Sequence, residues 1–130
     1  MRSAYTFLLA AVFIVFAAAS PRAALDFDQP ITTAGGFELI VMEAPGCTYC
    51  GLFRRDVLPS FQSSERAKNL PVRFLDVNDL DQAKLELKSP VQIVPTFVLA
   101  RNGREIGRIP GYVGPEMFFR SISYLMSAAP

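Results

Sequence analysis

Apolar and polar positions along the chain predict strands and helices in alternation. A strand is predicted over 38–42, and apolar residues recur at helical spacing after residue 50. The later segments are bounded by proline, glycine and other turn residues. In chain order, the predicted elements are a strand over 38–42, a helix that ends near 58, a helical piece over 61–69, a strand over 72–77, a helix over 80–87, a strand over 96–100, a strand over 105–109 and a helix over 116–126.

The order of these elements predicts how the strands pair. A helical crossover joins the first two strands, so we expect them to be parallel. Asn102 and Gly103 lie between the last two strands and suit the positive φ angles of a type I′ hairpin turn, so we expect these strands to be antiparallel. The sequence therefore predicts an α/β domain with a central mixed sheet and helices on both faces.

The first residues follow the pattern of a secretory signal peptide. Arg2 precedes an apolar run over 4–19, and small residues follow it. The run is shorter than the roughly 20 residues of a membrane-spanning helix, which favours a cleaved signal over 1–24. An uncleaved anchor stays open as the alternative. We therefore expect one domain over 25–130 that works outside the cytoplasm, where disulfides persist.

Charge and composition exclude some classes of function. Loss of 1–24 removes Arg2 and Arg22 but no acidic residue, so the formal net charge changes from +1 to about −1. A near-neutral domain without a basic block offers no footing for nucleic acid. No Gly-rich phosphate loop follows a predicted strand, so the sequence indicates no nucleotide, flavin or haem cofactor.

Cys47 and Cys50 are the only cysteines, and they lie between the first predicted strand and the helix that follows. This position places the Cys47 sulfur at a helix N-terminus, where unpaired N–H groups and the helix dipole favour a thiolate. Cys50 lies one turn further along the same face, close enough to resolve a mixed disulfide. The pattern therefore favours a redox-active dithiol–disulfide pair.

Three other uses of this cysteine pair remain open. A zinc site needs more ligands than two thiolates, and the chain has no histidine, so only carboxylates could complete one. A structural disulfide at this spacing closes a tiny loop and restrains little of the unfolded chain. Two thiolates also suit Cu(I), as in a non-enzymatic copper-binding module. The redox interpretation requires no metal.

Three features in this order resemble the thioredoxin superfamily, and the resemblance covers about 37–126. They are the Cys47-Thr48-Tyr49-Cys50 motif after the first strand, the Val94-Pro95-Thr96 segment that resembles the family's cis-proline loop, and the Asn102-Gly103 hairpin followed by Gly111 and the final helix. The segment from Glu43 to Cys47, together with an N-terminal signal, is most similar to the small periplasmic thioredoxins of the bacterial sulfur-oxidation (Sox) type. The resemblance implies a thioredoxin-like fold and a periplasmic location.

The resemblance also implies roles for individual residues. Cys47 would be the exposed attacking thiol and Cys50 the shielded resolving thiol. Pro95 would be cis, and the backbone of Val94 would pair with a substrate peptide. Tyr49 would line the contact surface or tune the Cys47 thiolate.

The chain departs from the thioredoxin pattern at three places. Gly46 stands where thioredoxins have tryptophan, the dipeptide between the cysteines is Thr-Tyr, and Val41 replaces the buried acid. Glu43 is then the nearest acid along the chain. It could move protons for Cys50 if it points inward, or it could be a solvated acid at the strand end.

We therefore expect a periplasmic thiol–disulfide oxidoreductase. It would reduce a disulfide or a modified cysteine on a partner protein through a cycle of Cys47 and Cys50, and a second redox partner, which could be membrane-bound, would recharge the pair. The reducing direction rests on the Sox-type resemblance. A disulfide-forming oxidase is the alternative, because direction depends on the reduction potential.

Overall fold

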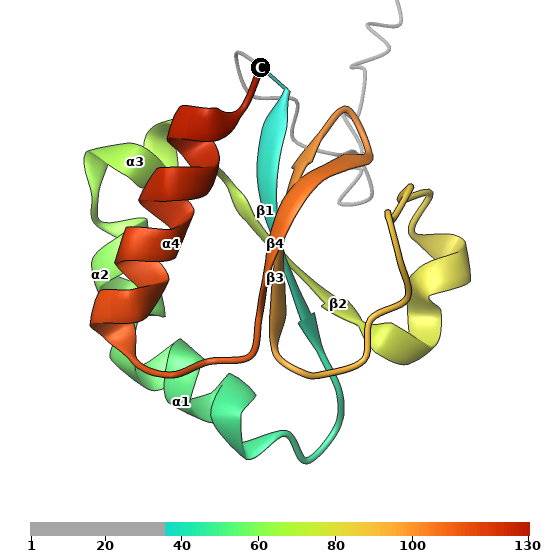
Figure 1. The fold of residues 1–130 in the computed structure, drawn as a ribbon. Helices are drawn as coiled ribbons and strands as arrows, with labels where there is room; N and C mark the ends of the chain where they lie inside the picture. Colours follow the sequence, from blue (N-terminus) through green and yellow to red (C-terminus); the bar gives the residue numbers. More distant parts are fainter. Residues whose placement is uncertain (1–35) are drawn as a thin grey trace, which may run out of the picture.

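The computed structural model describes residues 36–130, in which a four-stranded mixed sheet forms the centre (Figure 1). The predicted signal over 1–24 lies outside the described residues. The strands lie in the order β2-β1-β3-β4. β1 is parallel to β2, and the β1–β3 and β3–β4 pairs are antiparallel, which confirms the predicted strand pairing. The strands are β1 (Phe37–Glu43), β2 (Val72–Asp76), β3 (Thr96–Arg101) and β4 (Arg104–Pro110).

The two faces of the sheet are covered by different kinds of structure (Figure 1). Helices α1 to α4 lie on one face, which we call the helix face. The 3₁₀-helix η1 (Val77–Gln82) and the segment 83–95 lie on the other. We call this segment the connector and this side the connector face. The α-helices are α1 (Thr48–Asp56), α2 (Leu58–Gln62), α3 (Glu65–Asn69) and α4 (Pro115–Ala128).

The helical segment after the cysteines is broken twice. α1 ends before Val57, and α2 carries Pro59 in its first turn, where a missing N–H is tolerated. The helical piece predicted over 61–69 is in fact the end of α2 followed by α3. Ser64 interrupts it: its backbone is extended, and its hydroxyl donates a hydrogen bond to the Phe61 carbonyl (2.6 Å). Such local bonds compete with helix continuation.

The helix predicted over 80–87 is wrong. η1 ends at Gln82, and Lys84 has a φ of +49°, which a right-handed helix does not contain. Leu85 and Leu87 are half-buried and alternate with exposed charged residues. This period of two is that of a strand, and it explains why the apolar residues here do not form a helix.

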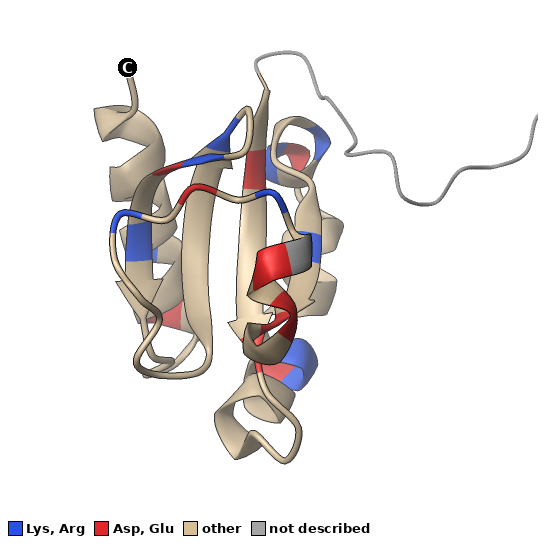
Figure 2. Cartoon of the chain, turned by 90° about the vertical axis from the view of Figure 1, so that its right-hand side faces the viewer, with Lys and Arg blue, Asp and Glu red and all other residues tan. Residues whose placement is uncertain are grey.

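The connector pairs instead with the free edge of β4. The N–H of Glu86 donates to the Gly103 carbonyl (2.8 Å), and the Glu86 carbonyl accepts from the N–H of Glu105 (2.9 Å). These bonds form an isolated parallel bridge between Glu86 and Arg104. Figure 2 looks onto this side of the molecule, where the connector crosses in front of the sheet. The conformation of the connector is therefore set by its backbone hydrogen bonds to the edge strand β4.

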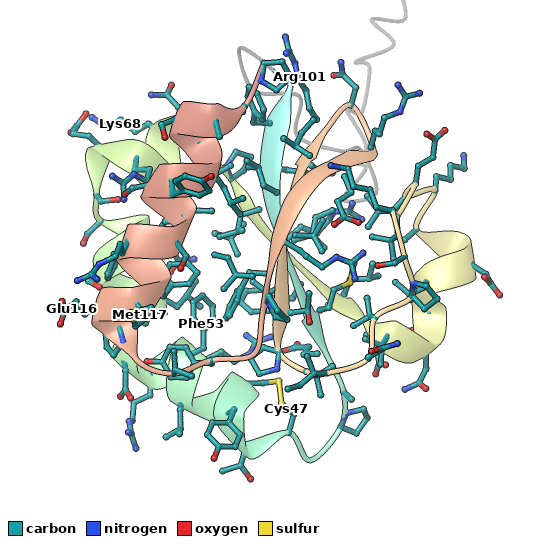
Figure 3. All side chains as sticks on the ribbon, in the orientation of Figure 1. Cys47, Phe53, Lys68, Arg101, Glu116 and Met117 are labelled. Atoms are coloured by element: carbon teal, nitrogen blue, oxygen red, sulfur yellow. A yellow bond between two sulfur atoms is a disulfide. The ribbon has the colours of Figure 1, made fainter. Side chains whose placement is uncertain are left out.

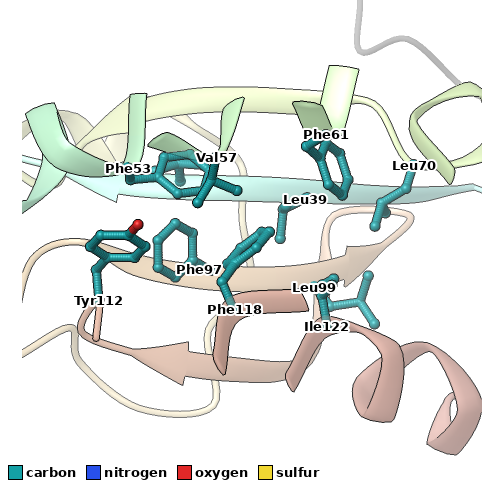
Figure 4. Close-up of a cluster of buried hydrophobic side chains, with 11 residues drawn as sticks. Leu39, Phe53, Val57, Phe61, Leu70, Phe97, Leu99, Tyr112, Phe118 and Ile122 are labelled. Carbon is teal, nitrogen blue, oxygen red and sulfur yellow. The ribbon is translucent and has the colours of Figure 1, made fainter. Parts of the chain in front are cut away.

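Alternate residues of β1 build two separate cores. Leu39 and Val41 point to the helix face, and Ile40 and Met42 point to the connector face, all fully buried. Figure 4 shows the helix-face core, in which aromatic rings from α1, α2, β3 and α4 meet. The helix-face core consists of Leu39, Val41, Phe53, Val57, Phe61, Leu70, Phe97, Leu99, Tyr112, Phe118 and Ile122. The buried residues of the connector-face core are Ile40, Met42, Val98 and Ala100.

Candidate active site

The two cysteines form a disulfide at the N-terminus of α1, with an S–S distance of 2.03 Å (Figure 3). Cys47 is the N-cap residue of α1: its backbone is extended, and its Sγ accepts a hydrogen bond from the N–H of Cys50 (3.2 Å). Gly46, with a φ of +76°, turns the chain from the β1–α1 loop into this position. The helix N-terminus therefore faces the Cys47 sulfur, where it favours negative charge.

The two sulfur-bearing residues differ in their access to solvent. Cys47 is partly exposed, whereas Cys50 is 4% exposed. Cys50 lies on the inner side of α1, next to the core residue Phe53 in the next turn. A partner protein can therefore approach Cys47 and not Cys50.

A second loop, which includes Val94 and Pro95, ends at the start of β3. The Val94–Pro95 peptide bond is cis, the isomer that the resemblance implies. The Thr96 hydroxyl donates to the Ile93 carbonyl (2.6 Å), and the N–H of Gly111 donates to the Pro95 carbonyl (2.8 Å). These bonds tie the loop to the start of β3 and to the end of β4.

A groove with a volume of about 690 Å³ lies between α1 and the loop that joins β4 to α4. Tyr49 and Val94 line it, so the groove brings together a residue between the cysteines and a residue of the cis-proline loop. Ile93 and Val113, which the sequence analysis missed, also line it. Tyr49, Ile93 and Val113 are 58%, 52% and 81% exposed, an unusual exposure for apolar side chains. The cysteines themselves do not line the groove, but Tyr49 between them does, and an exposed apolar surface at this place is typical of a protein-binding site.

Tyr112 is a second residue that the sequence analysis missed. It lines the groove and is 8% exposed, and its hydroxyl has no hydrogen-bond partner among residues 36–130. Burial raises the pKa of Tyr112, and the nearby Asp56 carboxylate adds to this, so the hydroxyl stays protonated. In the sequence, the only sign of this part of the groove is that Tyr112 and Val113 lie together between Gly111 and Gly114.

Glu43 lies at the end of β1 and is paired with α1. Its two carboxylate oxygens accept hydrogen bonds from Arg54, at 2.6 Å and 3.2 Å. The Arg54 guanidinium also lies over the ring of Phe74, 3.6 Å from the centroid. Val41, where thioredoxins carry a buried acid, belongs to the helix-face core. The Glu43 carboxylate is thus held in an ion pair with α1.

In residues 36–130, no group of three or more His, Cys, Asp or Glu side chains is arranged to hold a metal ion. No helix in the same range is both long and apolar enough to cross a membrane.

Comparison with known proteins agrees with this geometry. The family model for a thioredoxin-like domain matches residues 31–125. The periplasmic thioredoxin SoxS from Paracoccus pantotrophus, in its reduced form, is 33% identical, with a TM-score of 0.66, over 70% of this chain and 96% of its own. Oxidised mitochondrial thioredoxin 3 from Saccharomyces cerevisiae is 25% identical, with a TM-score of 0.53, over 71% of this chain and 81% of its own.

A thioredoxin from Malassezia sympodialis shares the fold at 20% identity, with a TM-score of 0.58, over 72% of this chain and 80% of its own. No curated protein sequence matches the chain. The matched family domain spans both cysteines, the cis-proline loop and most of the final helix. This chain belongs to the thioredoxin-like family, and its Cys47–Cys50 pair is that of a thiol–disulfide oxidoreductase.

Proposed function

We propose that this protein is a periplasmic reductase of disulfides or modified cysteines on a partner protein. The observation that carries the proposal is the position of Cys47, which is partly exposed at a helix N-terminus two residues before Tyr49 of the groove, whereas Cys50 is buried. The signal-like segment over 1–24 and the similarity to a periplasmic thioredoxin support the location.

The reaction begins from the reduced dithiol. The Cys47 thiolate attacks a sulfur of the partner's disulfide, a Cys47–partner S–S bond forms, and the partner's other sulfur leaves as a thiolate that takes up a proton. Cys50 then loses its proton and attacks the Cys47 sulfur, and the partner's remaining sulfur leaves. Two electrons have passed to the partner, and Cys47–Cys50 is the disulfide. A separate dithiol donor restores the reduced pair.

The groove supplies the partner's binding site in this proposal. An extended segment of the partner would lie along the cis-proline loop and pair with the backbone of Val94, while the exposed side chain of Tyr49 contacts the residues beside its cysteine. Pro95 is buried and does not line the groove, so its role would be to shape the loop that presents Val94. The exposed side chains of Ile93 and Val113 would add apolar contact area.

Glu43 is the proposed proton acceptor for Cys50. Glu43→Gln tests this role because it keeps the shape of the side chain and removes its basicity. We expect the resolving step to slow at neutral pH, measured as the lifetime of the mixed disulfide in single-turnover experiments. An unchanged lifetime would leave Glu43 as an acid paired with Arg54 at the surface.

Covalent trapping tests the cysteine roles. Cys50→Ser should accumulate a mixed disulfide between Cys47 and the natural partner, seen as a band that a reductant removes on a non-reducing gel. Cys47→Ser is the matched control and should trap nothing and reduce no insulin. Insulin reduction by the Cys47→Ser variant would overturn the assignment of the attacking thiol.

The reduction potential of the Cys47–Cys50 pair tests the direction of electron transfer between this protein and its partner. Equilibration of the domain in defined thiol buffers should give a value near that of thioredoxin, about −270 mV. A value near −120 mV would identify a disulfide-forming oxidase instead.

A further inference from the structure

A partly buried ion pair on β4 lies next to the connector that leads to the cis-proline loop. Glu105 is 3% exposed, and both of its carboxylate oxygens accept hydrogen bonds from Arg108, at 2.7 Å and 2.6 Å. The Arg108 side chain is itself 18% exposed. Removing a charged pair from water is costly, so we ask which interactions of Glu105 and Arg108 offset this cost.

An irregularity in β4 brings the two side chains together. Residues three apart in a regular strand point to opposite faces of a sheet. Here the register shifts between Leu99 and Ala100, so that Ile106 is an extra residue in β4, and Glu105 and Arg108 lie opposite Ala100 and Val98. Both of those β3 residues belong to the connector-face core, so the ion pair also faces the connector.

The ion pair holds the backbone of the connector. Glu105 accepts a hydrogen bond from the N–H of Lys88 (2.8 Å). Arg108 donates to the carbonyls of Ser89 (2.7 Å) and Pro90 (3.2 Å). These three bonds attach consecutive connector residues to β4. They do so where neither a helix nor a strand supports the chain.

The attachment lies just upstream of the loop at the groove. Ile93 and Val94, which line the groove, follow Pro90 after only two residues. Downstream, the bond from Gly111 to the Pro95 carbonyl forms the second attachment. The segment from Val91 to Val94 is thus held at both ends by β4 or the residue after it. A loop held at both ends loses less conformational freedom when a partner binds.

We infer that Glu105 and Arg108 are positioning residues for partner binding: their ion pair holds Ile93 and Val94 where a docking segment contacts them. This inference rests on the proposed function, because it concerns the site at which the partner would bind. It predicts that loss of the pair weakens recognition of a protein disulfide and leaves the chemistry of Cys47 intact.

The test compares a protein substrate with a small one. Arg108→Met removes the bonds to Ser89 and Pro90, and we expect the KM for insulin to rise about three- to tenfold, with kcat little changed. The rate constant of the reduced protein with cystamine, a small disulfide that does not need the loop, should change by less than about twofold. Arg108→Lys should give an intermediate KM, because an ammonium cannot reproduce the guanidinium fork.

A matched control is available on the same edge of the sheet. The Glu86–Arg104 pair has a comparable separation (2.9 Å), but both side chains are more than 70% exposed. Arg104→Met should leave the KM for insulin unchanged. Equal effects of Arg104→Met and Arg108→Met would overturn the inference, as would a cystamine rate that falls in parallel with insulin reduction.

The outcomes also separate this inference from the proposed function. Wild-type protein that reduces neither insulin nor cystamine would contradict the reductase proposal itself. Wild-type protein that reduces both, with an unchanged KM in folded Arg108→Met, would contradict only the positioning role. If Arg108→Met does not fold, Arg108→Lys and Glu105→Gln carry the same comparison, and an unchanged KM in both overturns the inference.

Discussion

The helix face and the connector face of the sheet are held by different forces. On the helix face, the ring of Phe53 lies 4.6 Å from that of Phe97 and 5.1 Å from that of Phe118, centroid to centroid, within a continuous apolar core. On the connector face, the four fully buried residues of the core include no aromatic ring. The covering segment adds only partly buried apolar side chains, among them Leu85, Leu87 and Val91, and hydrogen bonds to its backbone also hold it.

This difference matters because the site draws on both faces. Cys47 and Cys50 come from α1 on the helix face, and Val94 and Pro95 come from the connector. The helix face supplies the rigid support for the sulfurs. The connector face supplies a loop whose place depends on directional polar bonds. Substitutions on the two faces should therefore differ in how much stability they remove and in which property of the protein they change.

The largest expected effect is on the helix face. Phe53→Ala should lower the free energy of unfolding by about 3–5 kcal/mol, because a fully buried ring is replaced by a cavity. Ile40→Ala, its counterpart on the connector face, should cost less, about 2–3 kcal/mol, because fewer atoms are removed and because a covering segment without regular structure can collapse onto the gap. Urea denaturation measures both, and equal losses would contradict the contrast.

The next largest effect is expected at Glu105, whose ion pair with Arg108 holds the connector. The hydrogen bond from Arg108 lowers the pKa of Glu105 below its ordinary value of 4.5, and the Lys88 N–H adds to this against the cost of burial. The carboxylate therefore stabilises the fold fully above about pH 4.5, and this stability is lost as the pH falls through the lower, folded-state value.

Glu105→Gln should accordingly cost about 1–3 kcal/mol at neutral pH. The difference from wild type should shrink as the pH falls below about 4.5, measured as the denaturation midpoint in a pH series. A difference that stays constant through this range would show that the charge of Glu105 contributes nothing.

The smallest effects are expected at two glycines. At one of them an added methyl group would clash with a packed side chain, and at the other it would only restrict the backbone. A Cβ on Gly107 would lie 2.7 Å from a methyl group of Leu125, so Leu125 would have to shift, and Gly107→Ala should cost about 1 kcal/mol. A Cβ on Gly51, in α1, would meet nothing within 4 Å. Gly51→Ala should therefore stabilise the protein by about 0.5–1 kcal/mol. Thermal denaturation distinguishes these opposite signs.

Most of the architecture was predictable from local pattern. The apolar run of β1 and the Asn102-Gly103 turn predicted the strands and the hairpin, and both turn residues have the expected positive φ. The cysteine pair was predictable for the same reason, since its place between a strand and a helix sets its environment. The helix over 80–87 was mispredicted because the backbone of Glu86 pairs with the edge of β4, while Leu85 and Leu87 on either side of it pack against the connector-face core.

The groove was only partly predictable. Tyr49 and Val94 were predicted by resemblance, and both line it. Ile93, Tyr112 and Val113 were missed, because an apolar residue in a loop gives no sign of whether it will be buried or exposed. Their roles depend on how the β4–α4 loop lies against α1, which no short-range pattern contains.

Local sequence thus determined the elements, the redox pair and its helix N-terminus, because each depends on residues within a few positions of one another. The tertiary structure alone decided the arrangement around them. Glu105 and Arg108 face the same side only because β4 carries an extra residue opposite β3, and their bonds to the connector join segments 17 to 19 residues apart. Such pairing depends on strand register, and register is a property of the assembled sheet.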